Sequence, residues 1–235
     1  MCVIKILLWL LCLVLVAVTG LHWYFTHSFR IAAMVRMSAM KKESLYHSRR
    51  LKYNQIPAAF REAIISTEDR RFWWDPGIDP VGIGRSLIVD VEQDGYVEGG
   101  STITQQLVDN TLLDQHKTLS RKIRQAWDAI GLSLTMTKRE IFTTYTNVIY
   151  YGNGAYGLYN ASLTYFGRPP SQLNDGELTM LAGIPNNPHG DDPFRSLSDA
   201  RARQQVVLHN MVDQGVIAPF EAKEILTEPL HLSSS

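Results

Sequence analysis

Cysteine is nearly absent from this 235-residue sequence. Cys2 and Cys12 are its two cysteines, and both lie in an apolar stretch at the N-terminus. The rest of the chain therefore cannot carry a disulfide framework, a cysteine-ligated zinc ion or a cysteine nucleophile. The seven histidines are scattered, without the spacing of metal ligands, so we expect no metal site of this kind. The content of 45% hydrophobic and 20% charged residues argues against intrinsic disorder.

A net charge is also absent, because 23 basic residues balance 23 acidic ones. The two signs are nevertheless unevenly distributed. Residues 1–52 contain eight Lys or Arg and one acid, whereas residues 53–235 contain 15 basic and 22 acidic residues. A net-acidic body argues against nucleic acid as a partner, because contacts with phosphates require clustered Lys and Arg.

The longest apolar run covers residues 6–25 and contains no Lys, Arg, Asp or Glu. Its length is about that of an α-helix that crosses the hydrocarbon core of a bilayer. Trp23 and its two aromatic neighbours resemble the aromatic belt of a membrane interface. We therefore expect an uncleaved anchor at residues 1–28. A signal peptide cut near Gly20 is the alternative, but its small-residue cleavage pattern is poor.

The basic residues after this run leave two points open. Residues 29–52 mix Lys and Arg with apolar side chains, which suits an amphipathic segment on anionic lipid headgroups but also a solvated linker. The basic residues after the anchor outnumber Lys5 before it. By the positive-inside rule they would keep the body in the cytoplasm, an orientation that conflicts with the family-based placement given below.

After residue 52, apolar residues recur at helical spacing almost throughout. Pro57 suits a first helical turn, Ser101 can serve as an N-cap, and Thr137 with Glu140 matches a capping box. An apolar stripe predicts another helix over residues 119–134. Further helices are expected at 174–183, 196–214 and 219–227. No segment shows the sustained alternation of a β-strand.

This pattern predicts a mostly α fold. We expect one helical domain over residues 53–235, preceded by a transmembrane helix. Two segments without a clear helical period, 69–100 and 150–170, are expected to be loops that carry functional residues. Loops are frequent sites of binding and catalytic residues because a rigid scaffold positions them.

Three polar clusters could carry chemistry. Glu68 and Asp69 lie at a predicted helix end beside aromatic residues, where the proton affinity of a carboxylate can rise, or where an acid simply caps the helix. Residues 98–106 lead two glycines into a hydroxyl-rich helix start, which can hold an anion or be an ordinary N-cap. Arg121 and Lys122 could clamp a diphosphate, or lie on a solvated helix face.

The order of these clusters resembles a known family, the peptidoglycan glycosyltransferases of glycosyltransferase family 51. Its members are the polymerase modules of class A penicillin-binding proteins and the monofunctional transglycosylases. The family motifs EDxxFxxHxG, GxSTxTQQ, RKxxE, KxEIxxxYxN and GxPxxP are similar to residues 68–77, 99–106, 121–125, 138–147 and 183–188. The similarity covers residues 45–228, nearly all of the chain after the anchor.

The resemblance implies a lysozyme-like helical domain that polymerises the lipid-linked precursor lipid II into glycan strands. Glu68 would be the general base that takes the proton of the acceptor sugar's 4-hydroxyl, with inversion at the anomeric carbon. Fixed positive charge would neutralise the departing lipid diphosphate. The substrate-binding residues that the family implies are Asp69, Phe72, Ser101, Thr102, Gln106, Asn110, Arg121, Lys122 and Gln125.

The same resemblance implies a place in the bacterial inner membrane, with a single span and the catalytic domain on the periplasmic side. The partners would be lipid II, the growing glycan strand, the membrane and other cell-wall synthesis proteins. No cofactor is certain, although a divalent cation held near Asp69 or Asp109 could assist the reaction.

Three motif positions depart from the family pattern. Asp75 replaces a histidine, Asp109 a lysine, and Gln125 a glutamate. Asp109 places a negative charge beside the expected diphosphate, which at ~4–6 Å costs on the order of 1 kcal/mol or more. Gln125 can form hydrogen bonds but cannot exchange a proton at neutral pH.

These departures leave three hypotheses. In the first, the chain is a divergent but working glycan polymerase that relies on its retained base and cations. In the second, it is an impaired relative that binds lipid II or cell-wall partners as a scaffold or regulator. A lysozyme-like hydrolase is the third, because a single glutamate in a helical cleft also suits glycoside cleavage.

Overall fold

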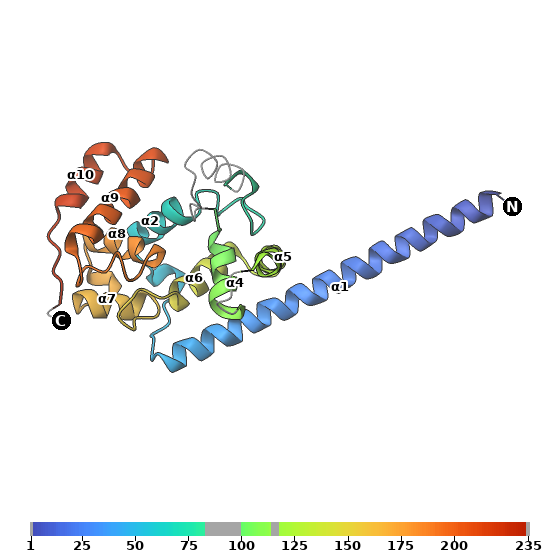
Figure 1. Ribbon diagram of the computed structural model, residues 1–235, viewed down its shortest axis with the longest axis horizontal. Coiled ribbons are helices and arrows are strands. Elements are labelled where there is room, and N and C mark those ends of the chain that lie inside the picture. The colour runs from blue at the N-terminus through green and yellow to red at the C-terminus, as the bar shows by residue number, and fades with distance from the viewer. Residues whose placement is uncertain (1, 83–99, 114–117, 234–235) are drawn as a thin grey trace.

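The computed structural model describes residues 2–82, 100–113 and 118–233 (Figure 1). Over these ranges the chain forms helices and no strand, and an isolated bridge joins Tyr150 to Tyr156. The predicted mostly α fold is thus confirmed. The α-helices are α1 (Cys2–Leu45), α2 (Ala58–Glu68), α4 (Ile103–Leu112), α5 (Leu119–Thr135), α6 (Lys138–Val148), α7 (Leu158–Phe166), α8 (Asp175–Gly183), α9 (Leu197–Asp213) and α10 (Pro219–Thr227). The short 3-10 helices are η1 (Tyr53–Gln55), η2 (Pro170–Gln172) and η3 (Ile184–Asn186).

Helix α1 continues without interruption for 44 residues and passes through two environments. Its first half projects away from the body (Figure 1). That half carries exposed apolar side chains from Trp9 to Trp23, and α1 is long and apolar enough to cross a membrane. The second half lies against α4, α5 and α6 and buries Ile31 and Val35. One helix therefore serves as both a candidate anchor and a part of the hydrophobic core.

The basic segment 29–52 is consequently not a solvated linker over its helical part. Its apolar side chains Ile31, Val35 and Ala39 recur every four residues, so they form one stripe that the body covers. Met37, on another face of the helix, is 69% exposed. The domain boundaries after residues 28 and 52 stay a prediction, and α1 itself has no break at residue 28.

The helices of the body form two packed groups. In one group α2 packs against α8 and α9, and α10 packs against α9. In the other, α4 packs against α1, α5 and α6. A contiguous core runs through both groups and includes the fully buried rings of Phe60, Phe142 and Tyr145. Glu68 ends α2 and therefore lies at the edge of the first group.

Most helix starts follow the predicted signals. Thr137 and Glu140 form the capping box of α6. The N-cap of α4 is Thr102 and not Ser101, because the Thr102 hydroxyl accepts a hydrogen bond from the amide of Gln105 at 3.1 Å. Both residues carry a hydroxyl group, and the sequence alone did not distinguish which of them would reach that amide.

Two segments differ from the sequence-based expectation. The segment 150–170 contains helix α7, which lies between Gly157 and Gly167, both with positive φ. Such a short helix between turn residues gives little periodic signal.

Helix α5 forms as predicted, but its apolar stripe faces outward, with Leu119 78% and Ile123 64% exposed. In the other expected loop, residues 70–74 form turns, and residues 83–99 lie outside the described part of the chain.

Candidate active site

Glu68 is held by side chains from two other helices. Its Oε2 accepts a hydrogen bond from Nε2 of Gln106 on α4 at 2.7 Å, and its Oε1 lies 3.4 Å from Nη2 of Arg203 on α9. The side chain is 10% exposed. Burial raises the pKa of Glu68, whereas the hydrogen bond from Gln106 and the charge of Arg203 lower it. A positioned carboxylate with raised proton affinity has the properties of a general base or acid.

Tyr145 fixes the orientation of Gln106. Its hydroxyl donates a hydrogen bond to Oε1 of Gln106 at 3.0 Å, which leaves the amide NH₂ group to face Glu68. Tyr145 is fully buried, and burial together with the nearby charge of Glu68 raises its pKa well above the usual value. The hydroxyl therefore keeps its proton and remains a donor.

Asp69 links the end of α2 to the start of α4. Its side chain is buried, and Oδ2 accepts a hydrogen bond from the amide of Ile103, the first residue of α4, at 3.0 Å. A negative charge suits the positive end of the helix dipole there. Burial and the neighbouring Asp75 nevertheless raise the pKa of Asp69 to about 7. Asp69 thus positions α4 relative to Glu68.

Asp75 and Phe72 lie within the structure that supports the site. Oδ2 of Asp75 pairs with Nζ of Lys138 at 3.0 Å, and Oδ1 accepts the amide of Gly77 at 2.6 Å. Lys138 also lies 4.7 Å from the ring centroid of Phe72. The Phe72 ring is fully buried against Phe142, so it supports the site from the core.

A second polar cluster joins α4 to α5. Oδ1 of Asp109 lies 2.8 Å from Nη2 of Arg121, and Nε2 of Gln125 donates a hydrogen bond to Oδ2 of Asp109. Oε1 of the buried Gln125 accepts a hydrogen bond from Nε2 of Gln105 at 3.3 Å. Burial raises the pKa of Asp109, whereas Arg121 and Lys122 lower it. Two of the three departures from the family pattern therefore contact each other.

The remaining predicted residues divide between this cluster and local structure. Arg121 and Lys122 together form the cation cluster of this region. Nζ of Lys122 donates a hydrogen bond to Oγ of Ser101 at 2.7 Å, which brings Ser101 to this cation cluster. The Thr102 hydroxyl donates to the carbonyl of Gly77 at 2.7 Å. The amide of Asn110 donates to the backbone of its own helix at 2.9 Å.

Helix α4 carries contacts to both clusters. Gln106 binds Glu68, and Asp109 binds Arg121. Residues three apart on a helix are neighbours on one face, with Cβ atoms roughly 5–6 Å apart. The predicted base and one of the predicted cations are thus held by adjacent positions of a single helix. Arg203 was not predicted, because it contacts Glu68 across 135 residues and belongs to no local motif.

No group of three or more His, Cys, Asp or Glu side chains that could hold a metal ion occurs among the described residues. Asp69 and Asp109, the two positions considered for a divalent cation, contact a backbone amide and a guanidinium group respectively. The described part of the chain therefore gives the proposed cation no ligand set.

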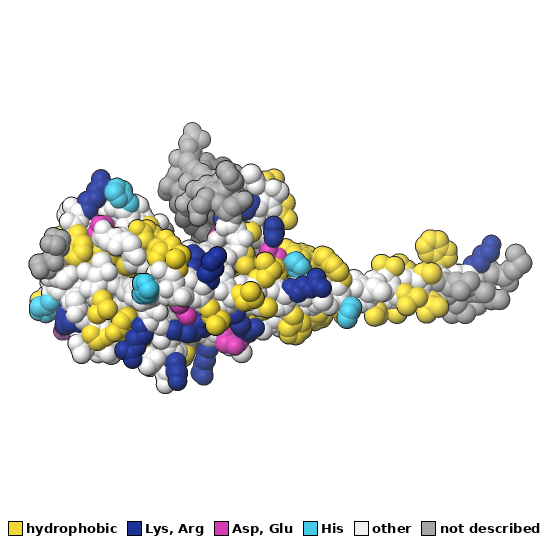
Figure 2. All heavy atoms as spheres, turned by 90° about the horizontal axis from the view of Figure 1, so that it is seen from below, with side chains coloured by type: hydrophobic (Ala, Val, Ile, Leu, Met, Phe, Trp, Pro, Cys, Tyr) yellow, Lys and Arg dark blue, Asp and Glu magenta, His cyan; other side chains and the backbone are white. Residues whose placement is uncertain are grey.

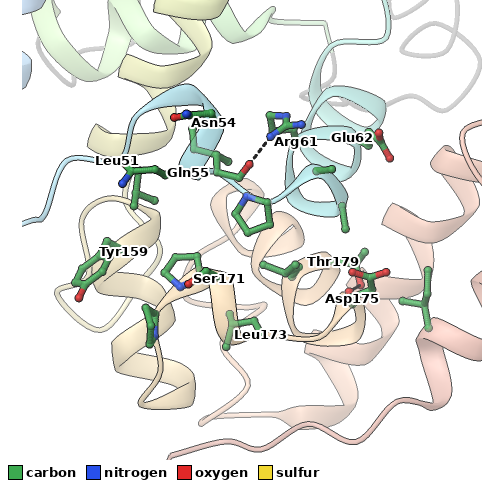
Figure 3. A pocket seen from close by; sticks show the side chains of 18 of the residues that line it. Leu51, Asn54, Gln55, Arg61, Glu62, Tyr159, Ser171, Leu173, Asp175 and Thr179 are labelled. Atoms are coloured by element: carbon green, nitrogen blue, oxygen red, sulfur yellow. Dashed lines mark hydrogen bonds between the residues drawn. The ribbon is translucent and has the colours of Figure 1, made fainter.

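A separate cavity of about 880 Å³ is lined by residues from the start of α2 (Figure 3), whereas Glu68 ends that helix. Leu51, Tyr159 and Asp175 are among its lining residues. Arg61, another lining residue, donates a hydrogen bond to the carbonyl of Ile56. Neither Glu68 nor the cation cluster lines this cavity, so it does not belong to the candidate active site.

The fold and the site thus define a helical domain in which one helix, α4, contacts both the nearly buried Glu68 and the guanidinium of Arg121. A family model described as Transglycosylase matches residues 36–212. The chain is 41% identical over 177 residues to penicillin-binding protein 1A of Aquifex aeolicus, covering 75% of this chain and 24% of that protein. It is 40% identical over 178 residues to penicillin-binding protein 1A of Escherichia coli K12, covering 76% and 21%. The chain therefore belongs to the transglycosylase family, which confirms the resemblance drawn from the motifs.

Among solved structures, the crystal structure of penicillin-binding protein 1A from Haemophilus influenzae matches with a TM-score of 0.49 and 22% identity. That match covers 80% of this chain and 18% of the other. The chain spans about a quarter or less of the length of these relatives.

Proposed function

We propose that this protein is a membrane-anchored peptidoglycan glycosyltransferase that polymerises lipid II into glycan strands. The observation that carries the proposal is the arrangement of Glu68, which is nearly buried and held by Gln106 and Arg203. An arrangement that raises the proton affinity of one carboxylate fits a family whose chemistry begins with removal of a hydroxyl proton.

In the proposed reaction, Glu68 takes the proton from the 4-hydroxyl of the acceptor sugar. The resulting oxygen nucleophile attacks the anomeric carbon of the growing chain and inverts its configuration. The bond from that carbon to the lipid diphosphate breaks, and the diphosphate leaves with the electron pair. A hydroxyl is a weak nucleophile near neutral pH, so this step requires a positioned base.

Arg121 and Lys122 would stabilise the negative charge that develops on the diphosphate. This role is supported by the contact that each cation makes with α4, the helix that also holds Glu68, or with the residues just before it. Arg121 is held by Asp109, one turn of α4 from the residue that binds Glu68, and Lys122 reaches the Ser101 hydroxyl at the start of that helix. The other implied ligands, including Thr102, would shape the site around this pair.

The surroundings of Glu68 favour an active enzyme over a scaffold. A hydrogen bond from Gln106 orients the carboxylate oxygen of Glu68, and Tyr145 in turn orients Gln106. A protein that only binds lipid II does not require a nearly buried carboxylate held in this way. The altered position Asp75 retains a paired role with Lys138 and lies beneath the site. Gln106 and Arg203, the residues described as holding Glu68, are unaffected by this position. The aspartate in place of histidine therefore leaves the described contacts of Glu68 intact.

The proposed membrane association has support on two surfaces. Apolar side chains follow the projecting half of α1 and reach the body where the helix meets it (Figure 2). Helix α5 adds Ile123 and Trp127, 64% and 47% exposed, and the Trp127 ring lies 4.7 Å from that of Tyr24 on α1. A domain resting on the bilayer here would place the site near the lipid-linked substrate. We propose a single span with the domain on the periplasmic side of the inner membrane.

The deciding experiment is a polymerisation assay with the purified full chain and labelled lipid II. We expect glycan strands from the native protein and none from Glu68→Gln. The matched control is Glu62→Gln, an exposed acid on the same helix, which should leave product formation unchanged. No glycan from the native protein, or equal amounts from native and Glu68→Gln, would refute the proposal. A topology reporter after residue 235 tests the orientation, and a cytoplasmic signal would contradict it.

A further inference from the structure

A chain of polar contacts connects the interior of α4 to the surface of α5. It starts at Gln105, whose Nε2 donates to Oε1 of Gln125, and continues from Nε2 of Gln125 to Oδ2 of Asp109. It reaches the ion pair between Asp109 and Arg121. Gln105 and Gln125 are both buried, so unmatched donors or acceptors along this chain would be costly.

The chemistry of each position depends on the other. Gln125 uses its amide as a donor toward Asp109 and as an acceptor toward Gln105, and a glutamate could not donate toward Asp109. A glutamate there would also place a second carboxylate against the first. Conversely, a lysine at 109 would face the guanidinium of Arg121, and the buried amide of Gln125 would lose its acceptor. Asp109 is therefore compatible with glutamine at position 125 but not with the usual glutamate. Gln125 is likewise compatible with aspartate at position 109 but not with the usual lysine.

We propose that Asp109 and Gln125 form a matched pair that replaces the lysine and glutamate usual in the family, and that Asp109 is a positioning residue for Arg121. The second part rests on the proposed function, in which Arg121 faces the lipid diphosphate. The support for the first part is that the two changed positions present a complementary donor and acceptor in direct contact. The pair is thus an alternative way to fix the same guanidinium group, at the expense of some net positive charge.

The first test is a thermal-unfolding cycle on the full chain in detergent. Asp109→Lys and Gln125→Glu should each lower the unfolding midpoint, by roughly 3–6 °C, because each creates a like-charge contact or an unpaired buried group. The double variant restores an opposite-charge pair, so it should recover most of the loss. Additive losses, or singles as stable as the native chain, would overturn the matched pair.

The second test measures lipid II polymerisation in a cycle of Asp109→Asn with Arg121→Gln. Asparagine can still accept from Gln125 but no longer pairs with Arg121. We expect Asp109→Asn to lower kcat/KM about tenfold, Asp109→Glu to restore part of it, and the double variant to match Arg121→Gln alone. The control is Asp213→Asn, an exposed acid at the end of α9, which should have no effect.

The outcomes are distinguishable. Multiplicative losses in the double variant, or higher activity in Asp109→Asn, would overturn the positioning role, because Asp109 would then act independently of Arg121 or against it. If the native chain makes no glycan, the proposed function fails, and with it any role of Asp109 toward the diphosphate. The unfolding cycle would still decide whether Asp109 and Gln125 are a matched pair.

Discussion

The two clusters on α4 differ in how they are built. Around Glu68, the contacts come from Gln106 of α4, which matches the family motif, and from Arg203 of α9. Around Asp109, the contacts within the described ranges join α4 and α5, and two motif residues are replaced together. The residues that contact the proposed base are thus unchanged from the family motif where they belong to it, whereas two of the residues that surround the proposed cations differ from it.

A physical reason lies in the distance dependence of the two tasks. A general base must reach one proton at hydrogen-bond distance, so its carboxylate cannot be moved or exchanged without loss. Neutralisation of a diphosphate depends on Coulomb interaction, which falls off gradually with distance and can come from several arrangements of charge. Different residue pairs can therefore hold Arg121, whereas Glu68 has no comparable substitute among the described contacts.

The largest effect should come from Glu68→Gln. Loss of the proposed base should reduce kcat by about 10²–10⁴-fold, because proton removal then depends on water. Lipid II affinity should change little, since the amide keeps the shape of the side chain. Steady-state kinetics and a separate binding assay would measure both quantities. A reduction of less than threefold would mean that the base lies elsewhere and would remove the contrast between the two ends.

The next effect concerns the support beneath the Glu68 end. Asp75→Asn should lower the free energy of unfolding by about 3 kcal/mol, because it leaves Lys138 without its partially buried counter-charge. Chemical denaturation of the full chain in detergent would measure this. The double variant with Lys138→Met should lose less than the single one. Unchanged stability in Asp75→Asn would show that this ion pair is not structural.

Lys122→Gln tests the cation end. The side chain is exposed, so we expect a loss of lipid II affinity of roughly fivefold at low salt, and a smaller one at 0.5 M salt, where exposed charges are screened. Lys223→Gln, an exposed lysine on α10, is the matched control and should show no loss. Equal losses in both variants would indicate a general charge effect on the surface.

The smallest expected effect is a change in pH dependence in Arg203→Gln. The charge of Arg203 lowers the pKa of Glu68, so its removal should raise that pKa further. A base acts only when ionised, so activity falls as pH decreases through its pKa. The acid limb of kcat/KM should therefore move to higher pH, with a several-fold loss below the limb and little change above it. A limb that does not move would assign it to another group.

The sequence predicted the helices with clear periodicity and capping signals, and it failed where these were weak. The capping box of Thr137 and Glu140 located the start of α6, and apolar spacing located α2 and α9. Helix α7 was missed because it is short and lies between glycines. The outward orientation of α5 could not be derived, because its buried face includes Gln125 and Asp128, and a polar buried face reverses the usual pattern.

For the site, the sequence identified positions but not partners. The family motifs located Glu68, Gln106 and Arg121, and in the structure α4 links them, because its Gln106 contacts Glu68 and its Asp109 contacts Arg121. Arg203 carries no local signal, since its contact with Glu68 is a product of the packing of α2 against α9. The link from Asp109 to Gln125 is likewise hidden, because the two residues lie 16 positions apart and belong to different motifs.

The unbroken course of α1 has a mechanical consequence. Because Ile31 and Val35 fix its second half in the core, the helix cannot pivot freely at the body as a tethered domain would. If the first half spans a bilayer, any tilt of that span to fit a thinner or thicker membrane must rotate the whole domain with it. Bilayer thickness would then set the height of Glu68 above the headgroups, and lipid composition would act as a control on the reaction.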